Sequence, residues 1–509
     1  MTNQAQQHYK NLHEQGIYIR TLTGIHQLLE WDQETYMPSG AADARSAQIE
    51  MLSGIIHEAQ TGRKFTQSLG KLIDLTKGTI KVKSLSTDQK IALKEWRRDY
   101  LKEKVLPKKF VTELAKLTSQ SLQSWREAKQ NNTFHTFAPF LKKLIVMKRK
   151  QADLLGYKDH PYDALLDLYE PGATTKEVEK VFSPLKKSIN SLLKRIGAAK
   201  QIDDSFLHGK FPSDKQIEFS KKLLLDMGFN FAHGRLDFST HPFSSALHPT
   251  DSRITTRIHP TSIINCVSTV LHEAGHSLYE MGLPQEQYGS PLGQAISLGV
   301  HESQSRWWET RIGQSKPFWQ HYLPLLKKTF PGKLDNISLE DFYRAVNKVE
   351  PSFIRVDADE VTYPLHVILR FELERALIEG SVDVDDIPKA WNGKMKELLG
   401  ITPTKDSEGC LQDVHWAMGG FGYFPTYTLG NLYAAHLFEG FEKSHPNWKE
   451  RLAKGELLFI TQWLEKNIHR HGRRYSSQEL LKVATGKEFS AAAYTRYLEE
   501  KYTEVYRMK

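Results

Sequence analysis

The stretch PTSIINCVSTVLHEAGHSLYEMGLP, residues 260–284, indicates the fold class of this chain. Its apolar side chains recur at three- and four-residue spacing, the pattern of an amphipathic helix. They are Ile263, Val267, Val270, Ala274 and Leu278. Residues 260–262 form a helix-capping sequence, and Gly282-Leu283-Pro284 contains the residues that end helices. We therefore predict one helix between these two signals.

This helix carries a metal-binding pattern, HEAGH at residues 272–276. Residues four apart share one face of a helix, so His272 and His276 can hold one Zn²⁺ with Glu273 beside the open coordination position. Zinc lowers the pKa of its bound water to about 7, and Glu273 would accept the proton and pass it to the leaving amine. The three fixed letters of this pattern, His-Glu-x-x-His, can match by chance in a chain with 21 histidines. Here, however, they lie in a proline-free amphipathic helix, which favours a zinc peptidase with Glu273 as general base.

A catalytic zinc ion usually has a third protein ligand. The metzincin pattern would require Gly and His where this chain has Tyr279 and Gly282, so that subclass is excluded. A carboxylate from the next predicted helix is the alternative, and Glu302 fits it. Glu280, on the motif helix itself, and Glu309, two turns beyond Glu302, are competing candidates.

Other zinc peptidases also carry an acidic residue four positions after the ligand glutamate, where it orients a zinc histidine. This chain has Arg306 there. The acceptor for the zinc histidines must then come from elsewhere, and Asp357 and Asp413 are candidates.

The rest of the chain is predicted to be mainly α-helical. Helical spacing dominates residues 9–232, whereas residues 252–258, rich in β-branched side chains, predict a short strand of a small sheet next to the motif helix. Further helices are expected at residues 298–312, 339–349 and 364–378, with a glycine- and aromatic-rich segment at 419–430. No linker is evident, so we expect one catalytic domain over residues 1–509, with a helical scaffold half, 1–232, and a zinc-site half, 233–509.

Composition excludes several other classes of protein. The 509 residues are 39% hydrophobic and 25% charged, as in folded soluble proteins. The net charge of +9 comes from scattered basic residues, so nucleic acid is not an expected partner. Two cysteines outside any CxxC pair exclude a thiolate zinc site. No stretch stays apolar for about 20 residues and no signal peptide is evident, so a cytoplasmic protein without membrane contact is expected.

Seven segments together resemble the carboxypeptidase Taq family of metallocarboxypeptidases. They are WDQETYMP (31–38), HPF (241–243), DSRIT (251–255), HEAGH (272–276), HESQSR (301–306), IRVDADE (354–360) and GCLQDVHW (409–416). The resemblance implies an almost wholly helical fold with a deep substrate groove, a homodimer, and release of single amino acids from peptide C-termini with broad side-chain tolerance. It also implies Glu302 as the third zinc ligand. One zinc ion per chain is expected, and Co²⁺ can substitute because it suits the same N and O ligands.

A carboxypeptidase must bind a free α-carboxylate, and a guanidinium offers it two parallel donors. Arg355 is the leading candidate, because it lies in a shared segment whose acidic residues 357, 359 and 360 could hold it in place. The alternative is a surface arginine in an ordinary ion-pair cluster. Arg253, on the predicted strand, is the second candidate. The resemblance adds His241 and Asp251 as substrate-binding residues.

Hydrolysis also builds negative charge on the former carbonyl oxygen, which calls for hydrogen-bond donors. Other helical zinc peptidases place a histidine and then a tyrosine in a glycine-rich stretch, and His415 and Tyr423, on either side of Gly419-Gly420-Phe421-Gly422, look similar. Tyr427 could replace Tyr423, and either tyrosine could be a packing residue. An endopeptidase or dipeptidyl peptidase, and a binding protein that keeps an inactive motif, are the rival functions.

Overall fold

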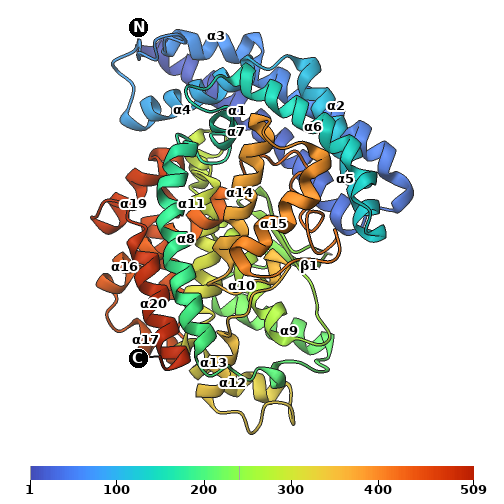
Figure 1. Ribbon diagram of the computed structural model, residues 1–509. Coiled ribbons are helices and arrows are strands. Elements are labelled where there is room, and N and C mark those ends of the chain that lie inside the picture. Colours follow the sequence, from blue (N-terminus) through green and yellow to red (C-terminus); the bar gives the residue numbers. More distant parts are fainter. Residues whose placement is uncertain (1, 240, 509) are drawn as a thin grey trace.

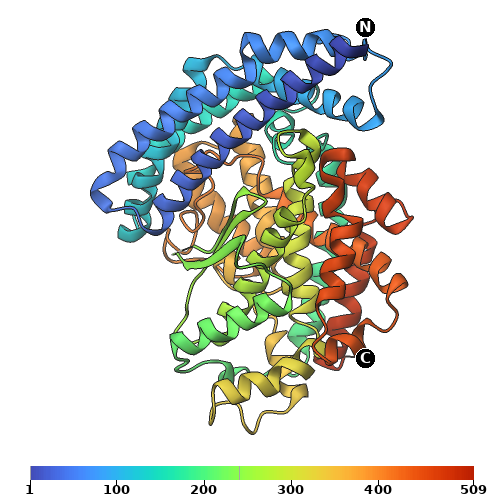
Figure 2. The same ribbon diagram turned by 180° about the vertical axis from the view of Figure 1, so that it is seen from behind.

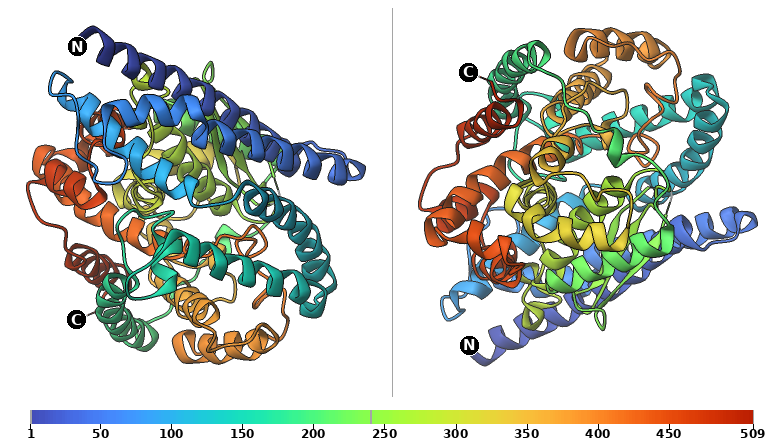
Figure 3. Two further views of the ribbon diagram at one scale, coloured as in Figure 1. Left: turned by 90° about the horizontal axis from the view of Figure 1, so that it is seen from above. Right: turned by 90° about the horizontal axis from the view of Figure 1, so that it is seen from below.

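Helices make up most of the molecule, as predicted. The computed structural model describes residues 2–239 and 241–508 (Figure 1). The first six helices group at one end of the molecule, as the views from above and below also show (Figure 3). Their bounds are α1 Thr2–Thr35, α2 Ala42–Thr61, α3 Arg63–Leu72, α4 Thr87–Lys104, α5 Lys108–Asn131 and α6 Phe134–Leu155. Leu12, Leu69 and Leu93 belong to a small core of their own that joins α1, α3 and α4.

Three further helices lead to the sheet. They are α7 Pro161–Leu166, α8 Thr175–Ala198 and α9 Ser213–Asp226. The strands are β1 Gly234–Phe238, β2 Ser244–His248 and β3 Asp251–Thr256, in the order β1-β3-β2. β1 runs parallel to β3, and β2 runs antiparallel to it. The predicted strand is thus confirmed as the central one, although it begins one residue earlier and ends two residues earlier than expected.

The sheet lies between α1 and the motif helix α10, Ile263–Met281 (Figure 2). β3 turns alternate residues to these two sides, because successive side chains of a strand point to opposite faces. Ser252 hydrogen-bonds through Oγ to Ser277 of α10 at 2.6 Å, whereas the guanidinium of Arg253 lies 4.6 Å from the ring of Trp31 on α1. The sheet therefore supports the motif helix from one side.

The remaining helices follow α10 in the chain, and α11 and α18 pack directly against it. They are α11 Leu298–Arg306, α12 Lys316–Thr329, α13 Leu339–Val346, α14 Tyr363–Glu379, α15 Ile387–Leu399, α16 Pro425–Ser444, α17 Trp448–Ala453, α18 Leu458–Asn467, α19 Ser477–Thr485 and α20 Ala492–Tyr506. The helix expected at 298–312 has two parts, because α11 continues as a π-helix, η5, at Trp307–Ile312. The segment 419–430 is irregular only as far as Phe424, since Pro425 begins α16. Tyr427 and Gly430 are therefore helical.

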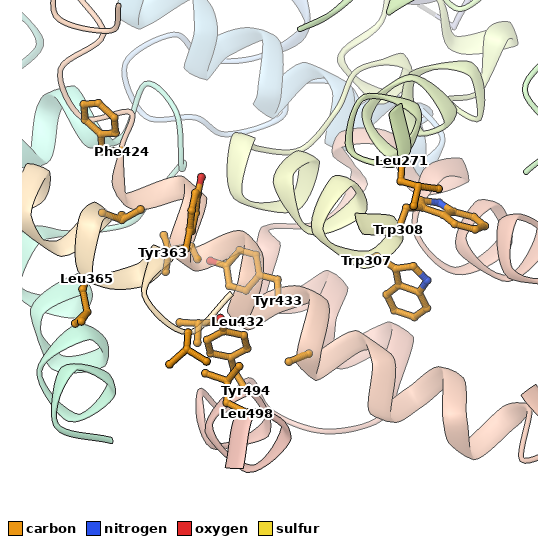
Figure 4. Packing of buried hydrophobic residues seen from close by; sticks show 14 of the residues in the cluster. Leu271, Trp307, Trp308, Tyr363, Leu365, Phe424, Leu432, Tyr433, Tyr494 and Leu498 are labelled. Carbon is orange, nitrogen blue, oxygen red and sulfur yellow. The ribbon is translucent and has the colours of Figure 1, made fainter. Parts of the chain in front are cut away.

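Large buried side chains join these helices into the main core. Figure 4 shows Leu271 of α10 beside Trp308 of η5, and Leu432 and Tyr433 of α16 near Tyr494 and Leu498 of α20. This core reaches from α5 to α20. No helix within the described residues is both long and apolar enough to cross a membrane. The deep groove implied by the resemblance stays a prediction.

Glycines bring the backbone of α11 close to both of its neighbours. A Cβ atom on Gly275 of α10 would lie 2.5 Å from the carbonyl oxygen of Gln304 and 2.6 Å from Cα of Ser305. On the other side, a Cβ on Gly430 of α16 would lie 2.6 Å from Cβ of Glu302. Only residues without a side chain permit such approaches. Glu302 is therefore held between α10 and α16, where its carboxylate can reach the two histidines of α10.

Candidate active site

His272, His276 and Glu302 form the one cluster of metal-ligand type found among the described residues. Their candidate ligand atoms all lie within 4.8 Å of one another. Oε2 of Glu302 is 3.4 Å from Nε2 of His276 and 3.6 Å from Nε2 of His272. The i, i+4 spacing on α10 and the close approach of α11 together produce this arrangement. Two imidazole nitrogens and one carboxylate are the ligand set of many catalytic zinc sites.

The polar atoms of this cluster fit a bound cation. Oε1 of Glu302 and Oε2 of Glu273 are buried and have no hydrogen-bond partner among the described residues. Buried acceptors without a partner are costly, and a cation would offset that cost. Burial opposes ionisation of Glu302, but His272 and His276 lower its pKa to about 2. The third candidate ligand is therefore an anion at neutral pH.

Each histidine is oriented through its other ring nitrogen. Nδ1 of His272 lies 2.8 Å from Oε2 of Glu309, and Nδ1 of His276 lies 2.6 Å from Nδ1 of His301. His301 is in turn 2.9 Å from Oε1 of Glu280 through Nε2. Sequence spacing allowed Glu280 and Glu309 as metal ligands. In the structure Glu309 contacts Nδ1 of His272 directly, and Glu280 contacts His276 through His301.

The prediction of Asp357 or Asp413 as the acceptor for the zinc histidines is wrong. Asp413 binds Arg355 and Arg370, and Asp357 lies 3.6 Å from Arg257. Sequence reasoning missed His301, although it directly precedes Glu302. The available signal was its position on the same helix as the predicted third ligand.

Glu273 lies on α10 between the two histidines and is 6% exposed. Burial raises the pKa of its carboxyl to about 7, and the neighbouring carboxylates Glu302 and Glu309 add to this effect. A pKa near the working pH suits a group that must both accept and release a proton. Glu273 therefore places a buried carboxyl with a pKa near neutral pH between the two histidines of the cluster.

His415 and Tyr423 lie together, and Tyr427 is beside them. Nε2 of His415 is 2.8 Å from the hydroxyl of Tyr427, and its ring centroid is 5.0 Å from that of Tyr423. Burial raises the pKa of Tyr423 to about 12, and the charges of Glu302 and Glu273 add to this effect. Burial lowers the pKa of His415 to about 3, so its ring is neutral. The phenol of Tyr423 is therefore a donor at neutral pH.

Arg355 is buried, at 4% exposure, so it is not a surface arginine. Its Nε and Nη2 atoms lie 3.0 and 2.9 Å from Oδ1 of Asp413, and Nη1 donates to the hydroxyl of Tyr363 at 2.9 Å. The expectation that residues 357, 359 and 360 hold Arg355 is wrong. Asp359 caps the start of α14 at Thr362, and Glu360 pairs with Lys501.

The other substrate-binding candidates fall in two places. Arg253 donates from Nε and Nη2 to the two oxygens of Asp251, at 2.9 Å each, on the sheet face turned to α1. His241 lies beside Trp125, with ring centroids 6.0 Å apart. Burial lowers its pKa to about 4, and the charges of Lys129, Asp413 and Arg355 also act on it. The indole of Trp125 donates to the carbonyl oxygen of Leu411, two residues before the Asp413 that binds Arg355. His241 thus lies toward Arg355, whereas Asp251 and Arg253 face α1.

Comparison with known proteins gives the family that the seven sequence segments resemble. Residues 11–502 match the family described as Carboxypeptidase Taq (M32) metallopeptidase. The chain is 40% identical over 508 residues to thermostable carboxypeptidase 1 of Thermus thermophilus, covering 98% of this chain and 99% of the relative. It is 39% identical over 480 residues to carboxypeptidase 1 of Bacillus subtilis, covering 94% and 95%.

A solved structure shares the fold. The M32 carboxypeptidase from Deinococcus radiodurans is 36% identical, with a TM-score of 0.92, over 98% of this chain and 100% of that chain. A sequence match and a structural match over nearly the full length of the chain point to one family. The chain therefore belongs to the carboxypeptidase Taq family of metallopeptidases.

Proposed function

We propose that this protein is a zinc-dependent metallocarboxypeptidase that hydrolyses the C-terminal peptide bond and releases single amino acids with broad side-chain specificity. The observation that carries the proposal is the cluster of His272, His276 and Glu302 with the buried carboxyl of Glu273 beside it. The named activity of relatives that match over nearly their whole length supports the choice of carboxypeptidase. One zinc ion per chain, replaceable by Co²⁺, suits this N and O ligand set.

Each residue of the site has its own role in the proposed reaction. His272, His276 and Glu302 would hold the metal, and Glu309 and His301 orient the two imidazoles. When bound, zinc acts as a Lewis acid on the substrate carbonyl and makes water more acidic. Glu273 takes the proton from the attacking water and delivers it to the nitrogen of the leaving amino acid. His415 and Tyr423 would donate hydrogen bonds to the carbonyl oxygen of the substrate, where negative charge develops.

Substrate recognition would begin at the α-carboxylate, and Arg355 stays our candidate for it. Asp413 fixes its guanidinium, while among the described residues Nη1 donates only to the hydroxyl of Tyr363. His241, in the same surroundings, would be the second contact. Asp251 and Arg253 would touch only those parts of a peptide that run along α1. The 509 residues would form one catalytic unit, since the main core spans both halves of the chain.

Association into a homodimer and a cytoplasmic location complete the proposal. Several large apolar side chains are exposed on the first two helices, including Ile25 at 46% and Met51 at 70%. Ile17, Leu28 and Ile55 are also exposed. Exposed apolar side chains that gather on neighbouring helices favour a protein partner. Light scattering after size-exclusion chromatography would give the mass of a dimer, and a monomer mass at micromolar concentration would contradict that part.

The activity is tested with matched peptides that end in a free carboxylate or an amide. Mass spectrometry over time should show the free acid losing one residue after another, and the amide should resist, because Arg355 has no carboxylate to bind. A chelator should stop the reaction. Internal cuts, or equal cleavage of both peptides, would favour the endopeptidase, and loss of residues in pairs the dipeptidyl enzyme.

The mechanism is tested with Glu273→Gln, which keeps every proposed metal ligand. We expect wild-type metal content and activity lower by several powers of ten, because the proton acceptor is lost. Chains that hold no zinc, or a variant that hydrolyses like the wild type, would favour a binding protein with an inactive motif.

A further inference from the structure

Helix α14 holds the segment that carries His415 and Tyr423 at two points. We call residues 413–424 the His415–Tyr423 loop. Near its start, Arg370 donates from Nε to Oδ2 of Asp413 at 2.6 Å. Further along, Glu374 accepts hydrogen bonds from the indole of Trp416 and the backbone N–H of Gly422. Arg370 and Glu374 are four residues apart, so one face of α14 presents both contacts to the loop.

Glu374 has no exposed surface, and both its oxygens accept hydrogen bonds. Oε1 accepts from Nε1 of Trp416 at 2.9 Å. Oε2 accepts from N of Gly422 at 3.0 Å and from the hydroxyl of Tyr162 at 2.7 Å. Two of its three donors therefore belong to the His415–Tyr423 loop.

A carboxyl group would be an unfavourable choice at this buried position if its side chain served only to fill space. Among the described residues no Lys or Arg nitrogen lies within ion-pair distance of Glu374, and burial raises its pKa to about 7. Replacing such buried groups with apolar side chains is often neutral or stabilising. The use of a carboxyl here is explained by its capacity to accept three hydrogen bonds at once, two of them from the loop.

The backbone at Gly422 packs tightly against α7. Gly422 has a φ of +91°, and a Cβ there would lie 2.6 Å from the carbonyl carbon of Leu165 of α7. The loop is thus pressed between α7 and Glu374. Tyr423 follows directly, and its ring lies 5.0 Å from that of His415 and 5.2 Å from that of Tyr169. A shift of Gly422 would therefore move Tyr423.

We propose that Glu374 is a positioning residue for hydrolysis, which fixes His415 and Tyr423 through Trp416 and Gly422 so that both serve the substrate carbonyl oxygen. The inference rests on the roles given to these two residues under the proposed function. Among the described residues Glu374 accepts hydrogen bonds from Trp416 and Gly422 of the loop and from Tyr162 of α7, so its route to His415 and Tyr423 runs through the loop. A misplacement of about 1 Å at catalytic groups can cost about a hundredfold in rate.

The chemistry of the three donors supplies a sharp test. Glu374→Gln preserves size, but its amide offers one accepting oxygen and one donating NH₂ group. Trp416 and Gly422 donate to different oxygens, so one of them would meet the NH₂ group and lose its bond. Trp416→Phe removes one loop contact by changing the donor, since phenylalanine has no indole N–H to donate to Glu374. Tyr162→Phe is the matched control, because it removes a donor to the same carboxyl and leaves both loop contacts in place.

The experiment measures kcat and KM on a blocked dipeptide with a free C-terminus, together with zinc content and Tm, for the full-length zinc enzyme. We expect Glu374→Gln and Trp416→Phe to lower kcat about tenfold or more. KM should stay within about threefold and zinc content unchanged, since neither variant touches the metal ligands or Arg355. Tyr162→Phe should stay within about threefold of the wild type in kcat.

A double-mutant cycle separates positioning from general stability. If Glu374 acts through the loop, Glu374→Gln should cost much less kcat in a Tyr423→Phe background than in the wild type, because interacting residues are not additive. Full additivity would overturn the proposal, as would wild-type kcat in both Glu374→Gln and Trp416→Phe. If Glu374→Gln does not fold, Trp416→Phe decides by the same criteria. Wild-type kcat in Tyr423→Phe would instead contradict the role given to Tyr423 in the proposed function.

Discussion

Oε2 of Glu309 lies 2.8 Å from Nδ1 of His272 and 2.6 Å from Nη1 of Arg306. Glu309 belongs to the π-helix that follows α11, and π-helical turns often occur at functional sites. The ring of His272 is thereby held with Nε2 toward Glu302. Arg306 holds the carboxylate of Glu309 in place, so this arginine supports the metal cluster through one intermediate residue.

We predict that Glu309→Ala weakens zinc binding about tenfold to a hundredfold, the usual cost of losing a residue that orients a metal ligand. Competition with a chromophoric chelator measures the affinity directly. Glu350→Gln, a change at an exposed carboxylate beside Lys348, is the control and should bind zinc like the wild type. Unchanged affinity in Glu309→Ala would show that the contact to His272 has no role in metal binding.

Gly275→Ala should destabilise the protein by about 2 kcal/mol, because inserting a methyl group into a packed contact forces backbones apart. The added Cβ would meet the backbone of Gln304 and Ser305, which cannot rotate away. Thermal unfolding should show a lower Tm and weaker zinc binding. Gly393→Ala, in α15 with open space around its Cβ, is the matched helical control and should leave Tm unchanged or slightly higher.

Removal of zinc should lower both activity and stability. Because a ligand that binds only the folded state stabilises it, zinc at a hundred times its Kd should add about 2.7 kcal/mol to the free energy of unfolding. Scanning calorimetry with chelator, then with added Zn²⁺ or Co²⁺, measures the shift in Tm. His276→Ala should lose most of this shift. A Tm that does not respond to either metal in the wild type would argue against a metal at this cluster.

Glu374 should make stability fall as pH rises from about 4.5 to about 7. Its pKa is about 7 in the folded protein and near 4.5 in the unfolded chain, so in this window the folded state holds the extra proton. The full effect is about 3 kcal/mol. Tyr162, Trp416 and Gly422 contact the carboxyl, and the charge of Arg370 also acts on it. Burial lowers the pKa of Lys148 to about 8 although the charge of Glu374 acts to raise it, so Lys148 titrates above this window.

Other groups titrate in the same range, so the measurement compares wild type with Glu374→Gln by thermal unfolding at several pH values. The wild type should lose Tm relative to the variant between pH 4.5 and 7.5, because only the wild type has this carboxyl. A constant difference in Tm over that range would show that Glu374 does not titrate there.

The order and spacing of residues determined the local part of this site. The i, i+4 spacing of His272 and His276 brings them to one face of any helix that contains them, and apolar periodicity identified that helix. The mainly α fold, with a small sheet beside α10, followed from the same kind of pattern.

Only the tertiary structure decided which residues stand behind the site. Glu309 meets His272, His301 meets His276, Asp413 holds Arg355, and Glu374 holds the His415–Tyr423 loop. Arg253 faces α1 because side chains alternate along β3 between α1 and α10, and Ser252 takes the α10 side. These pairs join helices that are far apart in the chain, and no local periodicity encodes how such helices pack. The sequence by itself therefore determined the metal-binding helix, and the packing of α10, α11, α14 and α16 determined the partners of its side chains.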